Sequence, residues 1–132
     1  DSHMTIADYP KNPDVKWIRE NTPKDAVFLN STYLYHPASL AGRKIFLGWP
    51  YFSWSLGYDT YKRDSLRKNL YNQNGLGSFC RIISEYNISF IETQVKTGDV
   101  GFINQDFFER HFPKMYENKE SGLKIYSIEP NC

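Results

Sequence analysis

The chain has 132 residues, which is enough for one domain with one core and too few for two. Its formal net charge is +1, so it lacks the basic excess by which proteins bind nucleic acid or anionic lipid. Aromatic residues reach 17%, with ten tyrosines, which is more than a core of this size buries completely. The composition therefore predicts a globular domain with an exposed aromatic surface and no nucleic-acid partner.

The first residues carry no information about the fold. Residues 1–4 are typical of a cloning remnant, and residues 5–13 hold two prolines without apolar periodicity, as expected of an extended lead-in. The sequence contains no apolar run of about 18 residues, so it predicts no membrane span. We expect a single α/β domain over residues 14–132.

Apolar periodicity, caps and breakers predict an alternation of helices and strands. In chain order the expected elements are helix 14–21, strand 26–30, helix 37–40, strand 44–48, helix 60–72, helix 76–86, strand 88–93, helix 105–112, strand 115–117 and strand 123–128. Asn12 or Asp14 is expected to cap the first helix, and Asn104 the last one.

This alternation favours an α/β sandwich of two or three layers, built on a small, mostly parallel sheet. Three central strands are expected to run parallel to one another. The last two strands are joined by residues 118–122, a connection of hairpin length, and add an antiparallel edge.

No group of residues in the sequence predicts a catalytic site, a metal site or a cofactor. His36 and His111 lie far apart, and neither has a second His or Cys at ligand spacing. Cys80 follows Phe79 in an amphipathic segment, and we expect it to pack in the core rather than to act as a nucleophile. Cys80 and Cys132 leave two alternatives open, one disulfide bridge or two free thiols.

The most unusual segment is GWPYFSWSLGYD, residues 48–59. It follows the second predicted strand, and open parallel sheets bind ligands beyond the carboxyl ends of their strands. Strand alternation cannot direct all of its rings to one core, so we expect some to meet a ligand or a lipid interface. The alternative is a structural loop that closes the top of the sheet.

The ligand-binding candidates are aromatic, acidic and basic side chains in or near this segment. Rings would stack on a sugar or dip toward lipid, Tyr58 and Asp59 would bind hydroxyl groups, and an arginine would bind phosphate. The candidates are Trp49, Tyr51, Trp54, Tyr58, Asp59, Arg43 and Arg63. Lys62 and Arg67 belong to the same basic set, which on a helix usually marks a solvated face.

Five segments in a fixed order span residues 14–128: WIRENTPKDAVFL, LAGRKIFLGWPYFSWSLGYD, ISFIET, FFERHFP and LKIYSIE. Together they resemble the C-terminal soluble part of polytopic GT-C-type membrane glycosyltransferases. These enzymes are relatives of the protein O-mannosyltransferases and of other enzymes that use dolichyl-phosphate sugars.

The resemblance implies an extracytoplasmic domain, periplasmic, extracellular or luminal, of a multi-pass enzyme with a lipid-linked sugar donor. The family's catalytic acid lies between early transmembrane helices, which this sequence lacks, so the resemblance implies a non-catalytic part of a hexosyltransferase. The implied partners are the transmembrane part of the parent enzyme and a glycan or lipid-phosphate sugar. Two alternatives stay open, a purely structural or protein-interaction domain with its aromatic loop buried, and a free-standing carbohydrate-binding module.

Overall fold

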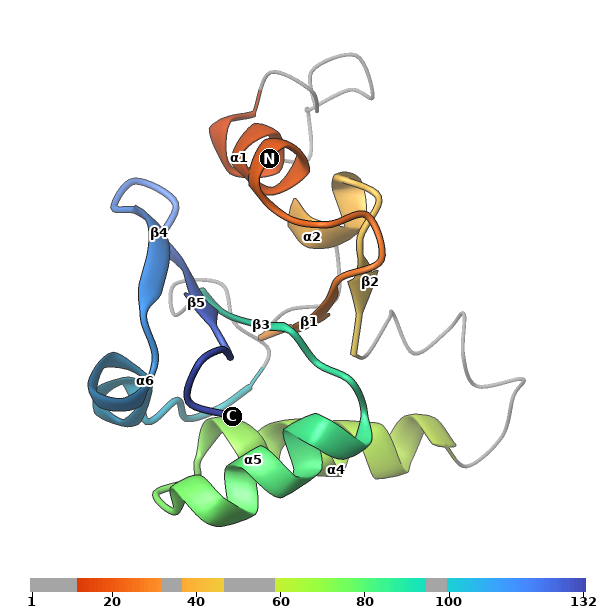
Figure 1. The fold of residues 1–132 in the computed structure, drawn as a ribbon, viewed down its shortest axis with the longest axis vertical. Helices are drawn as coiled ribbons and strands as arrows, with labels where there is room; N and C mark the ends of the chain where they lie inside the picture. Colours follow the sequence, from red (N-terminus) through yellow and green to blue (C-terminus); the bar gives the residue numbers. More distant parts are fainter. Residues whose placement is uncertain (1–11, 32–36, 47–58, 95–99) are drawn as a thin grey trace.

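A computed structural model describes residues 12–31, 37–46, 59–94 and 100–132, except for the side chains of 59–61 (Figure 1). In chain order the elements are α1 (Pro13–Asn21), β1 (Val27–Leu29), α2 (Pro37–Leu40), β2 (Lys44–Ile45), α4 (Asp59–Tyr71), α5 (Leu76–Glu85), β3 (Phe90–Gln94), α6 (Gln105–His111), β4 (Lys114–Asn118) and β5 (Leu123–Ser127). The predicted alternation of helices and strands is confirmed, and the fold class is mixed α/β.

The five strands form one sheet in the order β2-β1-β3-β5-β4. β1 pairs in parallel with both β2 and β3, which confirms the three parallel strands expected from the sequence. β5 pairs antiparallel with β3 on one side and with β4 on the other, so the C-terminal hairpin extends the sheet as predicted. β4 is therefore the antiparallel edge strand.

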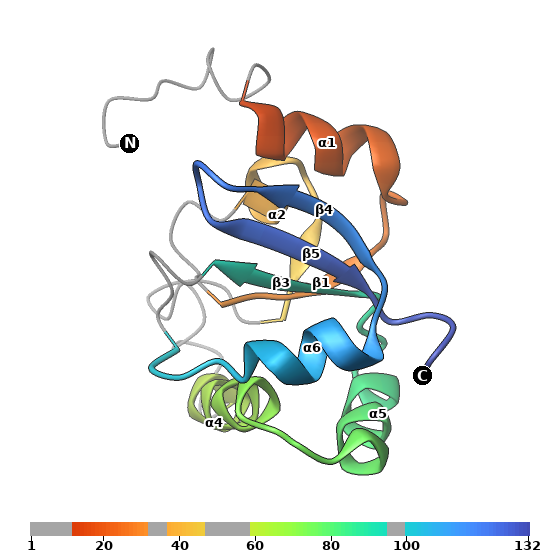
Figure 2. The same ribbon diagram turned by 90° about the vertical axis from the view of Figure 1, so that its left-hand side faces the viewer.

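Helices cover both faces of the sheet, which decides for three layers rather than two. α1 and α2 lie over one face, and α4, α5 and α6 lie over the other (Figures 1 and 2). Each face has its own apolar cluster, because successive strand residues point to opposite faces. Phe28 packs under α1 and α2, whereas its neighbour Leu29 packs toward α4 and α5.

Aromatic rings fill much of the larger cluster. Phe79 of α5 lies with its ring centroid 5.4 Å from that of Phe107 and 5.8 Å from that of Phe108, both of α6. These are edge-to-face contacts, which contribute about 0.5–1.5 kcal/mol per pair beyond the burial of apolar area. Rings that pack in this way join α5 to α6, which β3 separates in the chain.

The first helix begins and ends where the sequence predicts. The side chain of Asn12 accepts hydrogen bonds from the backbone N–H groups of Asp14 (2.9 Å) and Val15 (3.2 Å), and Pro13 occupies the first turn. Extended backbone at Thr22 ends the helix. The last predicted cap differs: Asn104 precedes α6, but its side chain donates to the carbonyl of Gln73 at 3.0 Å instead of capping the helix.

The start of α1 lies at the carboxyl end of β3. The Asp14 carboxylate is 4% exposed and accepts hydrogen bonds from the Tyr116 hydroxyl at 2.6 Å and the Asn118 amide at 2.8 Å. Asn118 is paired with Leu123 across the hairpin, and Leu123 with Gln94, the last residue of β3. These contacts place the amino end of α1 at the side of the sheet where the parallel strands have their carboxyl ends. This side is called the carboxyl edge below, and the side with their amino ends is called the amino edge.

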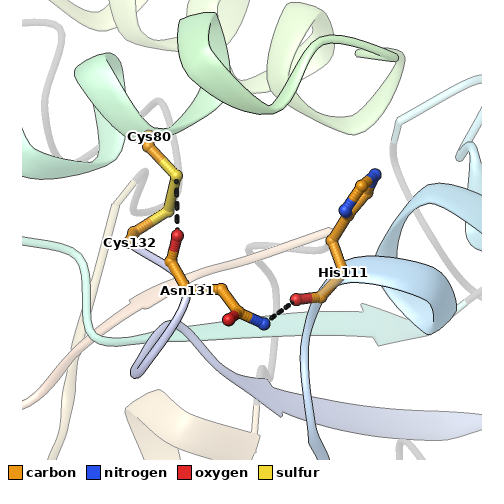
Figure 3. The surroundings of a disulfide bond; sticks show 4 residues. All are labelled: Cys80, His111, Asn131 and Cys132. Carbon is orange, nitrogen blue, oxygen red and sulfur yellow. Dashed lines mark hydrogen bonds between the residues drawn. A yellow bond between two sulfur atoms is a disulfide. The ribbon is translucent and has the colours of Figure 1, made fainter.

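A disulfide joins Cys80 in α5 to Cys132, with an S–S distance of 2.06 Å, which decides between the two alternatives for the cysteines (Figure 3). The prediction that Cys80 packs in the core is wrong, since its side chain is only partly buried. Neighbouring helix residues point about 100° apart, so Phe79 faces the core and Cys80 faces the chain terminus. The Asn131 side chain also donates to the carbonyl of His111.

The disulfide closes a sequence separation of 52 residues. Loop-closure entropy predicts that replacing both cysteines (Cys80→Ser with Cys132→Ser) lowers the free energy of unfolding by about 4 kcal/mol. Urea denaturation of the oxidised chain and of the double variant measures this difference.

Reductant supplies the control for that experiment. Dithiothreitol should lower the denaturation midpoint of the wild-type chain and leave that of the double variant unchanged. Equal midpoints for the oxidised chain and the double variant would show that the bridge does not stabilise the fold.

Candidate functional site

The order in which the chain adds parallel strands to the sheet reverses between β1 and β3. The chain passes from β1 to β2 on one side of the sheet and later returns to β3 on the other side. In open α/β sheets such a switch point is where ligand crevices form, beyond the carboxyl ends of the strands. The polar side chains at this edge are buried: Asn30, Ser31, Glu92 and Thr93 each show 0% exposure.

Glu92 links the carboxyl ends of β1 and β3. Its Oε1 atom accepts a hydrogen bond from the Ser31 backbone N–H at 2.7 Å and lies 3.0 Å from the Ser31 hydroxyl oxygen. That hydroxyl in turn accepts from the backbone N–H of Gln94 at 2.9 Å. A buried carboxylate is tolerated only where donors surround it, and here the backbone itself supplies one of them.

Arg67 approaches the same edge from α4. It is 1% exposed, and its guanidinium donates to the carbonyl of Asn30 at 3.1 Å and to the Asp64 carboxylate at 3.1 Å. The expectation that Arg67 lies on a solvated helix face is wrong, because this side of α4 packs on the sheet. Asp64 also pairs with Lys68 at 3.3 Å and so links the buried charge to the surface.

Tyr71 supports the same strand ends. Its hydroxyl lies 2.9 Å from the carbonyl oxygen of Leu29 and also contacts the carbonyl of Glu92. Complete burial raises the pKa of the Tyr71 phenol well above its ordinary value of 10.0, the charge of Glu92 raises it further, and the charge of Arg67 opposes the rise. The phenol therefore stays protonated and acts as a donor to backbone carbonyls.

The cluster holds the edge rigid rather than providing a nucleophile. Acyl transfer needs a hydroxyl that a substrate can reach beside a base, whereas Ser31 and Glu92 contact each other but are both 0% exposed. The ring of His111 packs on Phe107 at the far end of α6, with centroids 4.8 Å apart. Within the described residues, no group of three or more metal-binding side chains comes together.

A second polar chain runs from the sheet to the surface along α6. The Gln105 amide donates to the Tyr126 hydroxyl at 2.6 Å and lies 3.3 Å from the Thr93 hydroxyl. The Tyr126 hydroxyl donates to the Glu109 carboxylate at 2.6 Å, and Lys114 binds the same oxygen at 3.2 Å. The hydrogen bond from Tyr126, reinforced by Lys114, lowers the pKa of Glu109, while partial burial opposes that shift.

The opposite edge of the sheet is hollowed. A depression of about 830 Å³ lies at the amino ends of the three parallel strands, between the last turn of α5 and the residues that follow β5. Cys132 forms part of its wall, so the disulfide holds one side of the depression in place. Sequence reasoning did not predict this hollow, because its lining comes from stretches that are far apart in the chain, within 23–27, 83–90 and 127–132 and at Lys44.

Most of the predicted ligand-binding residues cannot be placed. The aromatic ones lie outside the described residues: Trp49, Tyr51, Trp54 and Tyr58. Asp59 is the first residue of α4, and its side chain is not described. Their proposed contacts with sugar, lipid and hydroxyl groups stay predictions.

Arg43 joins α1 to the start of β2. Its guanidinium is 9% exposed and donates to the Thr22 hydroxyl and carbonyl and to the Arg19 carbonyl, each at 3.0 Å. A fourth hydrogen bond reaches the carbonyl of Ala41 at 3.1 Å. The side chain satisfies carbonyl groups at the end of α1, which is a structural role and does not support the expected contact with phosphate.

Arg63 lies on the face of α4 that meets β2 and α5. Its guanidinium donates to the carbonyl of Phe46 at 3.0 Å, and its central carbon lies 5.2 Å and 5.5 Å from the ring centroids of Phe46 and Tyr86. Cation–π contacts of this geometry contribute about 0.5–2 kcal/mol. Through these contacts Arg63 joins α4 to the residue after β2 and to the end of α5.

Sequence reasoning missed Ser31, Glu92 and Tyr71. One signal was available, since Glu92 puts a charged residue directly after the apolar Phe90 and Ile91 inside the predicted strand 88–93. A charged residue at such a position requires buried partners. The identity of those partners could not be predicted, because the Ser31 donors lie just beyond β1, 61 residues earlier in the chain.

No protein-family model matches the sequence, and no curated protein matches it. In the structure, buried charges stabilise the carboxyl edge of the parallel strands, and the amino edge is hollow.

Replacing Glu92 should destabilise the fold strongly. In Glu92→Ala both Ser31 donors lose their acceptor in the interior, and we expect the free energy of unfolding to fall by about 3 kcal/mol. Glu92→Gln keeps one oxygen acceptor and should lose less than the alanine variant. Urea denaturation measures both.

Glu85→Ala, which removes an exposed carboxylate from α5, is the matched control and should stay within about 0.5 kcal/mol of the wild-type chain. If Glu92→Ala and Glu85→Ala have the same small effect, the buried carboxylate does not hold the edge.

The Tyr126–Glu109 hydrogen bond should be visible in acid titration. Because the pKa of Glu109 is depressed in the folded chain, its stabilisation is full above the ordinary value of 4.5 and is lost as pH falls through the lower folded value. Tyr126→Phe should raise the pKa of Glu109 toward 4.5, as measured by NMR titration of its side-chain carboxyl carbon. Glu117, whose pKa is lowered chiefly by Lys114, is the control and should keep its value.

Proposed function

We propose that this chain is the extracytoplasmic, non-catalytic domain of a membrane-embedded glycosyltransferase that uses a lipid-linked sugar donor. In this role it binds a glycan or positions the membrane part of the enzyme. The proposal starts from the resemblance of five ordered sequence segments to GT-C-type enzymes.

The observation that carries the proposal is the disulfide between Cys80 and Cys132. Structural disulfides form and persist in oxidising compartments such as the periplasm, the lumen of the secretory pathway and the cell exterior. An extracytoplasmic domain lies in such a compartment, so this bridge supports the localisation that the resemblance implies.

The arrangement of the segments supports the proposal further. The segment WIREN lies in α1, FFERH in α6 and LKIYS in β5, so the shared motifs belong to helices and strands that surround one sheet. α1 begins at the carboxyl edge of the parallel strands, as its contacts with β4 show. A membrane part that preceded α1 would approach the domain from the side where α1 begins.

Fractionation of source cells tests the proposal. An antibody raised against the chain should detect a membrane-bound protein far larger than 15.5 kDa, the mass of this chain. Protease added to intact cells, or to spheroplasts where an outer envelope shields the membrane, should remove an epitope that faces the exterior or the periplasm, while a cytosolic enzyme followed in the same samples stays intact. When the plasma membrane alone is permeabilised, protease should remove the cytosolic enzyme and leave a luminal epitope intact.

Two results would contradict the proposal. One is an epitope that stays in the soluble cytosolic fraction. The other is an epitope that becomes sensitive to protease together with the cytosolic enzyme, when the plasma membrane alone is permeabilised.

A further inference from the structure

The hollow at the amino ends of β1, β2 and β3 lies at the edge opposite the buried charge cluster. Its volume of about 830 Å³ is within the range of small-molecule binding sites, about 300–1,000 Å³. One wall is formed by the residues after β5, where the backbone N–H of Cys132 donates to the carbonyl of Ile128 at 3.1 Å. The disulfide attaches the same wall to α5, so the hollow is preorganised.

The lining combines apolar side chains with groups that bind hydroxyls. Val27 and Phe90 provide partly exposed apolar surface, and Asn87 and three serines provide amide and hydroxyl groups. The charged residues among those that line the hollow are Asp25, Lys44 and Glu129. Two carboxylates against one ammonium disfavour a phosphate ligand, whereas carboxylates and amides readily accept hydrogen bonds from hydroxyl groups.

The backbone at this edge is already paired, which disfavours an extended peptide as the ligand. The Lys44 N–H donates to the carbonyl of Ala26 at 3.3 Å, and the Ser89 N–H donates to that of Val27 at 2.9 Å. The carbonyl of Ser89 accepts from Ile128 at 3.1 Å. A peptide that adds to a sheet needs open backbone groups, so recognition in this hollow depends on side chains.

We propose that this hollow binds a neutral oligosaccharide of two or three sugar units. The inference rests on the proposed function, to which it adds the place and the chemical class of the ligand. Apolar surface such as the Phe90 ring contacts the C–H face of a sugar, and Asp25, Asn87 and Glu129 bind its hydroxyl groups.

Chemical-shift mapping on the ¹⁵N-labelled 132-residue chain tests the inference. The probes are mannotriose, chitotriose and maltotriose, which differ in hydroxyl pattern, with inorganic phosphate as the anionic comparison. At least one trisaccharide should give saturable shifts at amides of residues 25–27, 44, 83–90 and 127–132. Phosphate should give none that saturate.

A pair of asparagine variants provides the matched control. Asn87 has a φ of 57°, which glycine adopts without strain, so Asn87→Gly removes the amide and keeps the turn. It should weaken trisaccharide binding about tenfold, the effect of losing one well-formed hydrogen bond. Asn72→Gly alters an exposed asparagine after α4 that does not line the hollow, and it should bind as the wild-type chain does.

Three results would overturn the inference: no saturable shift with any of the trisaccharides, saturable shifts centred on residues 30–31 and 92–94 instead, or wild-type affinity in Asn87→Gly. The fractionation experiment separates this inference from the proposed function. If the protein is cytosolic but binds sugar at the hollow, the proposed function is contradicted and the inferred site is supported. If the protein is membrane-bound but binds no sugar, only the inferred site is contradicted.

Discussion

The carboxylate of Glu92 is buried in the sheet and accepts hydrogen bonds from the backbone N–H and the hydroxyl of Ser31. This contact joins the end of β1 to β3 at the point where the strand order switches. A buried charge cannot lose its donors without a large desolvation penalty, so the relative position of the two strand ends is narrowly defined. Arg67 and Tyr71 bind the carbonyl groups of the same strand ends from α4.

The two edges of the parallel strands are stabilised by different physical means. At the carboxyl edge, buried charges and hydroxyls bind one another and the backbone, which produces a rigid support. At the amino edge, backbone pairing closes the sheet and a disulfide holds the terminal residues against α5, which leaves a hollow between them. The parallel strands therefore have one edge of buried polar contacts beside the start of α1 and one concave edge at their amino ends.

Local sequence signals were sufficient for most of the fold. Asn12 and Pro13 predicted the start of α1, and the apolar runs around Phe28 and Ile91 predicted two strands, which the structure pairs in parallel. Arg43 and Arg67 show where such reasoning fails. Both read as charged surface residues in the sequence, yet one binds the carbonyl groups that end α1 and the other lies under β1. A guanidinium is buried only when acceptors converge on it, and these acceptors are distant in sequence.

The sequence by itself determined the order of helices and strands, the parallel centre of the sheet and the antiparallel hairpin, because periodicity, caps and breakers act within a few residues. Only the tertiary structure decided the three layers, the pairing of Cys80 with Cys132, the partners of Glu92 and the existence of the hollow. Each of these depends on residues far apart in the chain, and no local pattern encodes which of them meet. The aromatic segment 48–59 stays a prediction of the sequence.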